Sequence, residues 1–197
     1  MTPDERQEIE DSVRLMVEDF QKWSHDVVER PNRSFNGLPA CPFAGAAWAH
    51  GLVNVHITPE LGDVAGIKSV MDAHDPEVNV ILWTGWEDVT PDEFNQWVDQ
   101  QNQNHFGIWV MGFHPDAATN EAVATFDGLI EDDYGVILVQ SLAHLVRASD
   151  RLRRAGYYQS FDQEDMKYIN GRRETYHAWH EKVAKKMLQT DDGGALN

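Results

Sequence analysis

The sequence is poor in cysteine, because Cys41 is the single one among 197 residues. One cysteine cannot form an intramolecular disulfide, and such scarcity is typical of proteins kept in a reducing compartment. The first 20 residues carry seven carboxylates, a composition unlike that of a secretory signal peptide. No apolar run approaches the roughly 20 residues that a membrane-spanning helix requires. These absences predict a cytoplasmic protein with no membrane partner.

Basic residues are also scarce. The chain holds 16 lysines and arginines against 33 carboxylates, which gives a formal net charge of −17. A surface this negative repels nucleic-acid phosphates and anionic lipid, so we expect no nucleic-acid partner. The charge favours solubility, and it also suits the recruitment of cations or of a basic partner. The oligomeric state is not predicted by these features.

The composition is sufficient for a core. Hydrophobic residues make up 42% of the chain and include seven tryptophans and eight phenylalanines. That content and length suit one domain. We expect a single α/β domain over residues 1–189 and a flexible acidic tail over residues 190–197, where no apolar pattern remains.

The N-terminal segment has the pattern of a long amphipathic helix. Thr2 suits the N-cap, Pro3 the first helical position and Glu5 the third, which together predict a capping box. Apolar residues then recur at helical spacing, and the helix is expected to end before Pro31. The apolar positions are Ile9, Val13, Met16, Phe20, Trp23 and Val27.

The rest of the chain alternates between strand and helix patterns. Strands are predicted at residues 52–58, 78–83 and 107–113, and helices at 63–74 and 162–188. Of two further predicted helices, one begins at the Thr90 cap and the other has a C-cap near Gly156. The buried stripe of the latter consists of Leu142, Leu145, Val146 and Leu152. Residues 117–133 are expected to form a loop or short helix, and residues 135–139 a fourth strand or the start of the next helix. The pattern predicts an α/β or α+β fold. We expect a small three- to four-stranded mixed sheet covered by helices, with long N- and C-terminal helices and at least one βαβ crossover.

The segment Cys41-Pro42-Phe43-Ala44 is the first candidate for a functional centre. Because proline favours the first position of a helix, Cys41 is predicted at a helix N-cap. Free backbone N–H groups and the positive end of the helix dipole stabilise a thiolate there and lower the thiol pKa. A nucleophilic, redox-active or metal-binding cysteine needs that environment. The alternative is a small cysteine packed in the interior.

The second candidate is His114, which follows a predicted strand and precedes Pro115. The residue before a proline is held extended, so the strand end projects His114 at an edge where catalytic groups gather in sheets with βαβ connections. His56, near the end of an earlier strand, is expected at the same edge. We expect Cys41 to act as nucleophile and His114 as general base or ion-pair partner. A hydrogen-bonded structural histidine is the alternative.

Two further groupings leave other chemistries open. His114, Asp116 and His144 have the residue types of a 2-His-1-carboxylate site, which favours iron or another transition metal as cofactor. A separate basic strip on one helical face suits an anionic substrate group or surface ion pairs. The strip consists of His144, Arg147, Arg151 and Arg154.

Several of these segments together resemble an uncharacterised bacterial family, a domain of unknown function. The matching segments are Trp23, Cys41-Pro42-Phe43-Ala44, Phe113-His114-Pro115 and Ala143-His144-Leu145-Val146-Arg147. The resemblance spans roughly residues 20–155. It implies that the cysteine and histidine motifs belong to one site, and it implies no particular activity.

The lead hypothesis is a thiol-dependent enzyme with a Cys41/His114 centre, acting on a small-molecule anionic substrate bound by His144, Arg147 and His56. It requires no cofactor. One alternative is a non-haem iron oxidoreductase that uses His114, Asp116 and His144. The other is a non-catalytic binding protein whose acidic or tryptophan-rich surface docks a partner, in which case Cys41 and His114 are expected to be separated and buried.

Overall fold

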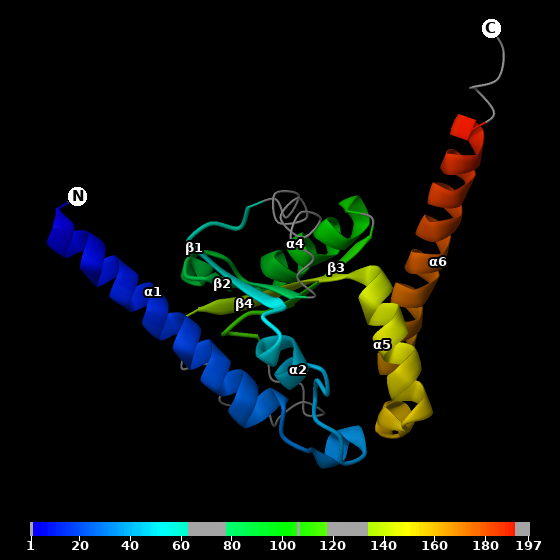
Figure 1. Ribbon diagram of the computed structural model, residues 1–197, viewed down its shortest axis with the longest axis horizontal. Helices are drawn as coiled ribbons and strands as arrows, with labels where there is room; N and C mark the ends of the chain where they lie inside the picture. The colour runs from blue at the N-terminus through cyan, green and yellow to red at the C-terminus, as the bar shows by residue number, and fades with distance from the viewer. Residues whose placement is uncertain (1, 63–77, 106, 118–133, 192–197) are drawn as a thin grey trace, which may run out of the picture.

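A four-stranded mixed sheet forms the centre of the structure (Figure 1), with the strand order β1-β2-β4-β3. The computed structural model describes residues 2–62, 78–105, 107–117 and 134–191. The strands are β1 (Val53–Thr58), β2 (Val78–Trp83), β3 (Ile108–Phe113) and β4 (Gly135–Ser141). Strand β1 pairs parallel to β2, and the other pairs are antiparallel. The predicted mixed sheet and α/β class are confirmed, and residues 135–141 form a strand.

Helices precede, interrupt and follow the strands. The longer ones are α1 (Pro3–Trp23), α4 (Pro91–Asn104), α5 (Leu142–Arg154) and α6 (Gln163–Asp191), and α2 (Ala44–Ala49) is short. The π-helix η1 (Ser24–Val28) prolongs α1, and 3₁₀ turns lie at η2 (Arg33–Phe35), η3 (Trp86–Asp88) and η5 (Tyr157–Ser160). The predicted helix at 63–74, the segment 118–133 and the tail from residue 192 lie outside the described residues.

Two helices begin at capping boxes, as their sequences predict. The Thr2 side chain accepts from the Glu5 N–H, and the Glu5 carboxylate accepts from the Thr2 N–H. Thr90 and Glu93 repeat this exchange at α4. Each pair satisfies two backbone donors that a helix start otherwise leaves without partners.

One face of the sheet is covered by α4. Ile81 and Ile137 of the central strands point to this face and pack with Phe94. The Phe94 ring also stacks on Trp83, with ring centroids 5.3 Å apart. Gly112 of β3 permits this close approach, because a Cβ there would collide with the Phe94 ring.

The opposite face is divided between two sets of helices. Phe20 of α1 packs on Val80 and Leu82, which alternate with the residues that face α4. Beside β3, Trp109 packs with Leu142 and Val146 of α5. In Figure 1 the first part of α1 extends past the sheet on one side, and α5 and α6 lie on the other. Among the described residues, none of the helices has both the length and the apolar character that crossing a bilayer demands.

The free edge of β3 is closed by a side chain of α4. The Asn102 amide donates to the Val110 carbonyl at 2.9 Å, and its carbonyl oxygen accepts from the Val110 N–H at 2.8 Å. Val110 is fully buried. The amide therefore takes the place that a neighbouring strand's backbone would occupy, on an edge that is otherwise a site for unwanted pairing.

We predict that Asn102→Ala lowers the free energy of unfolding by about 1–3 kcal/mol, because it leaves two buried backbone groups without partners. Asn104→Ala is the matched control, since Asn104 is exposed on the same helix and gains the same helix propensity. Urea unfolding of both variants measures the difference. Equal changes in the free energy of unfolding for the two variants would show that the Asn102 side chain does not stabilise the β3 edge.

Candidate functional site

Cys41 lies in a turn that precedes α2, two residues before the helix N-cap. The N-cap is Phe43, and the Cys41 carbonyl accepts from the Ala44 N–H across the turn. The predicted N-cap position of Cys41 is therefore wrong by two residues. The cause is local: Pro42 lies in the turn and α2 begins only at Ala44.

The environment of the Cys41 thiol raises its pKa. Burial is the largest cause, because it disfavours the charged thiolate. Hydrogen bonds from the backbone of Phe43 and Ala44 act in the opposite direction, and the negative charge of Glu29 adds to the rise. The predicted stabilisation by backbone N–H groups thus exists, but burial outweighs it. The expected lowering of the pKa is wrong.

Glu29 supplies the negative charge at the start of α2. Its carboxylate lies against Gly45, where any side chain would collide with it. Ser24 of the π-helix donates to this carboxylate at 3.4 Å, and Trp48 of α2 donates to the Ser24 hydroxyl at 3.0 Å. Helix starts favour negative charge. Here Glu29 satisfies that preference in place of a thiolate.

Tyr157 holds the other side of the Cys41 turn. Its hydroxyl donates to the Ala40 carbonyl, and its ring stacks on Phe35 with centroids 5.1 Å apart. Burial raises the pKa of Tyr157 from its usual 10.0, and the charge of Cys41 adds to the rise, while Arg172 lowers it. Glu29 and Tyr157, which belong to distant parts of the chain, thus both act on the turn: Glu29 through its charge and Tyr157 through its hydrogen bond to Ala40.

His114 is buried, and both of its ring nitrogens are engaged. Nε2 donates to the Val89 carbonyl at 2.7 Å, and Nδ1 accepts from the Asp116 N–H at 3.1 Å. These bonds fix one neutral tautomer. The ring is also surrounded edge-on by Trp83, Trp86 and Phe94, with centroids 5.6–5.9 Å away. The hydrogen bond to Val89 therefore connects the end of β3 to the turn before α4.

The structure does not bring Cys41 and His114 together. Cys41 precedes α2, which leads into the first residue of β1, whereas His114 follows the last residue of β3. Strands β1 and β3 run in the same direction, because β1 is parallel to β2 and both β2 and β3 are antiparallel to β4. The two residues therefore lie at opposite ends of strands that span about 17 Å. The rings that contact His114, which are Trp83, Trp86 and Phe94, belong to the core beneath α4.

The other predicted site residues lie apart as well. His56 of β1 is hydrogen-bonded to Asn79 of β2, with 3.3 Å between Nε2 and Oδ1. His144 and Arg147 lie on α5, at the end of the sheet away from His114, and Arg147 is exposed. No cluster of three or more metal-ligating side chains occurs in the described ranges. The His114, Asp116 and His144 set is thus not assembled.

The described surface has one conspicuous apolar feature, which helical spacing alone would assign to the core. The large apolar side chains that stay exposed in the described residues are Ile9, Val13 and Leu15, at 55%, 41% and 60%. All three lie on α1. Ile9 and Val13 continue the stripe that Met16 and Phe20 bury against the sheet. Their helical spacing is visible in the sequence, but the point where the sheet stops covering the helix is not.

Comparison with known proteins gives no relative: no family model, no curated protein and no solved structure matches the chain. The resemblance to the bacterial family with Cys-Pro-Phe-Ala and Phe-His-Pro motifs therefore stays a prediction. Function has to be inferred from the contacts and the exposure of the described side chains.

We predict that the Cys41 thiol reacts with iodoacetamide more slowly at neutral pH than the same thiol in the urea-unfolded chain, because its pKa is raised. Glu29→Gln removes a negative charge that disfavours the thiolate, so it should speed the reaction by a few-fold. Glu10→Gln, an exposed change on α1, is the control. Mass spectrometry of timed samples gives the rates, and a native thiol that outpaces the unfolded one would contradict the assignment.

We also predict that the protein loses stability in alkali. A group whose pKa is raised by folding stabilises the protein fully below its unfolded pKa, and this contribution declines as the pH rises further. For Cys41 and Tyr157 the decline begins near their ordinary values of 9.0 and 10.0. Tyr157→Phe should be less stable at neutral pH but decline less steeply above about pH 10, where the wild type begins to lose the contribution of the tyrosine. Tyr158→Phe keeps the bond to Ala40 and is the control at neutral pH, where it should match the wild type in urea titrations.

Proposed function

We propose that the protein is a non-catalytic binding protein that docks a basic amphipathic helix of a partner on the exposed half of α1. A cytoplasmic location belongs to the same proposal. The single observation that carries it is the apolar stripe of Ile9 and Val13, which runs without interruption from the core into solvent. We call this surface the α1 stripe.

The α1 stripe has the spacing of a helix-packing surface. Ile9, Val13, Met16 and Phe20 follow one another at intervals of four, three and four residues, which places them on one side of the helix. The last two already pack into the core. A partner helix laid beside the first two would extend that packing, and complete burial of an isoleucine or valine side chain contributes about 1.5–3 kcal/mol.

The charge beside the stripe selects the kind of partner. Seven carboxylates and two arginines lie on α1 between Asp4 and Asp19. Arg14 is already paired with Asp11 at 2.9 Å and with Glu18 at 3.8 Å. A helix with lysines or arginines beside its apolar face complements this surface. A second α1 would place two acidic helices together, which disfavours self-association through the same stripe.

The surroundings of Cys41 and His114 agree with a binding role. The Cys41 thiol is held in its neutral form by the rise in its pKa, and both His114 nitrogens already have partners. The non-catalytic hypothesis expects the two residues to be separated and buried. Their positions at opposite ends of the strands support that hypothesis over a Cys41/His114 pair.

The proposal is tested with a synthetic peptide of about 20 residues that carries leucines at helical spacing and lysines elsewhere. Fluorescence anisotropy should show saturable binding to the full chain. Ile9→Ser/Val13→Ser should weaken binding by about tenfold or more, because it removes the apolar contact without changing the charge. Leu15→Ser is the matched control, because Leu15 is more exposed but lies off the stripe. The affinity of this variant for the peptide should stay within about twofold of the wild-type affinity.

Two further outcomes would overturn the proposal. A peptide of identical composition with its leucines scrambled should bind much more weakly, and equal binding would mean that charge alone attracts the peptide. Light scattering at increasing protein concentration is the second control. A dimer that Ile9→Ser/Val13→Ser abolishes would assign the stripe to a second copy of the chain instead of a basic partner.

A further inference from the structure

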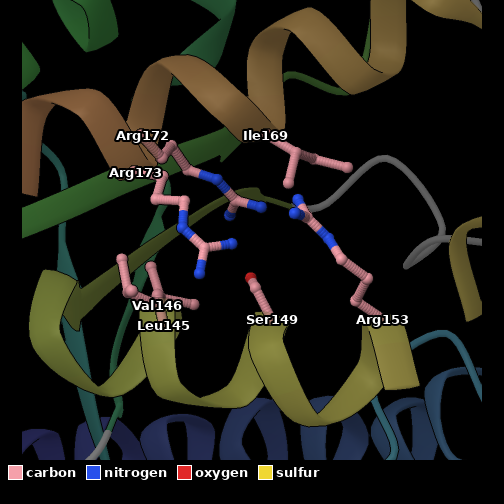
Figure 2. A pocket seen from close by; sticks show the side chains of 7 residues that line it. All are labelled: Leu145, Val146, Ser149, Arg153, Ile169, Arg172 and Arg173. Atoms are coloured by element: carbon pink, nitrogen blue, oxygen red, sulfur yellow. The ribbon is translucent and has the colours of Figure 1, made fainter. Parts of the chain in front are cut away.

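A groove between α5 and α6 gathers positive charge in this acidic protein. Figure 2 shows the side chains of Arg153 from α5 and of Arg172 and Arg173 from α6 pointing into the same space, with the Ser149 hydroxyl facing them. Apolar side chains also line it, among them Val146 of α5 and Ile169 of α6, which are 8% and 7% exposed. We call this feature the arginine groove.

Each guanidinium of the groove is held by a neighbour. Arg173 pairs with Asp150, Arg153 donates to the Asn170 side chain at 3.2 Å, and Arg172 lies over the Trp109 ring at 5.9 Å from its centroid. The partner that holds Arg153 is thus a neutral amide, which leaves its charge available to an anion. Asp150 offsets the charge of Arg173, but three guanidiniums against one carboxylate leave a net positive charge among these side chains, which a bound anion would neutralise.

We propose that the arginine groove binds a phosphate group, as the free ion or as the end of a small phosphate monoester. A guanidinium presents N–H donors in a fixed fork that matches phosphate oxygens. Three such forks and a hydroxyl can surround a tetrahedral ion from several directions. The apolar residues of the lining strengthen these bonds by reducing screening.

The arginine groove is independent of the docking proposal. It lies on α5 and α6, whereas the first half of α1, which carries the stripe, lies at the opposite end of the view in Figure 1. It also differs from the basic strip that the sequence suggested. Arg147, Arg151 and Arg154 are exposed and do not line the groove. The groove takes Arg153 from α5 and its other two arginines from α6.

The test is calorimetric titration of the full chain with inorganic phosphate at physiological salt. We expect saturable binding that Arg153→Gln weakens by about tenfold or more. Arg151→Gln is the matched control, since it removes the same charge from the same helix outside the groove, and its affinity should be unchanged. Arg172→Lys keeps the charge but loses the planar fork, and should also weaken binding.

Thermal unfolding provides a second readout that does not depend on calorimetric heats. A ligand that binds only the folded chain raises its Tm, so phosphate should stabilise the wild type and Arg151→Gln but not Arg153→Gln. Absence of saturable phosphate binding, or equal losses in Arg151→Gln and Arg153→Gln, would overturn the proposal. Binding of succinate with no binding of phosphate would overturn the phosphate assignment.

Discussion

The rest of the structure depends on the burial of the antiparallel β2–β4 pair on both of its faces. Val80 and Leu82 point to one face and Ile81 and Trp83 to the other, and all four are nearly inaccessible to solvent. A sheet whose centre is apolar on both sides needs a helical layer on each. The α4 layer covers one face, while α1, α2, α5 and α6 share the other. Because a four-stranded sheet is narrow, the long helices extend past its edges, and the first part of α1 lies beyond the core.

Much of the fold was predictable because its signals are local. The two Thr-Pro-Asp-Glu segments fixed the starts of α1 and α4, and the boundaries of β2 followed from its apolar run. Residues 135–139 are ambiguous in the sequence because a strand buried on both faces lacks the alternation that marks a half-buried one. Their identity as a strand follows from pairing with both β2 and β3, which is information about distant residues that the segment itself does not carry.

The candidate site was less predictable because long-range contacts decide it. Pro42 indicates a helix start next to Cys41, and the backbone donors expected around a thiolate are present. Burial of the thiol and the charge of Glu29 nevertheless reverse the sign of the pKa shift. Tyr157 also holds the turn through its hydrogen bond to Ala40, and the two residues are 117 positions apart in the sequence. His114 shows the same limit: the sequence placed it at a strand end, but only the fold supplies Val89 as the acceptor for its ring.

The uneven distribution of charge gives the two proposed ligands different physical requirements. A net charge of −17 attracts a basic helix from a distance, so encounter with the α1 stripe is helped by long-range electrostatics and weakened by salt. The same net charge repels an approaching phosphate. An anion site can work on this protein only if short-range bonds outweigh that repulsion, which requires guanidiniums fixed in place before the anion arrives. The contacts of Arg153 with Asn170, Arg172 with Trp109 and Arg173 with Asp150 provide such fixing. Physiological salt screens repulsion between exposed charges more than about 8 Å apart, so salt should weaken the approach of the basic helix while it eases the approach of phosphate.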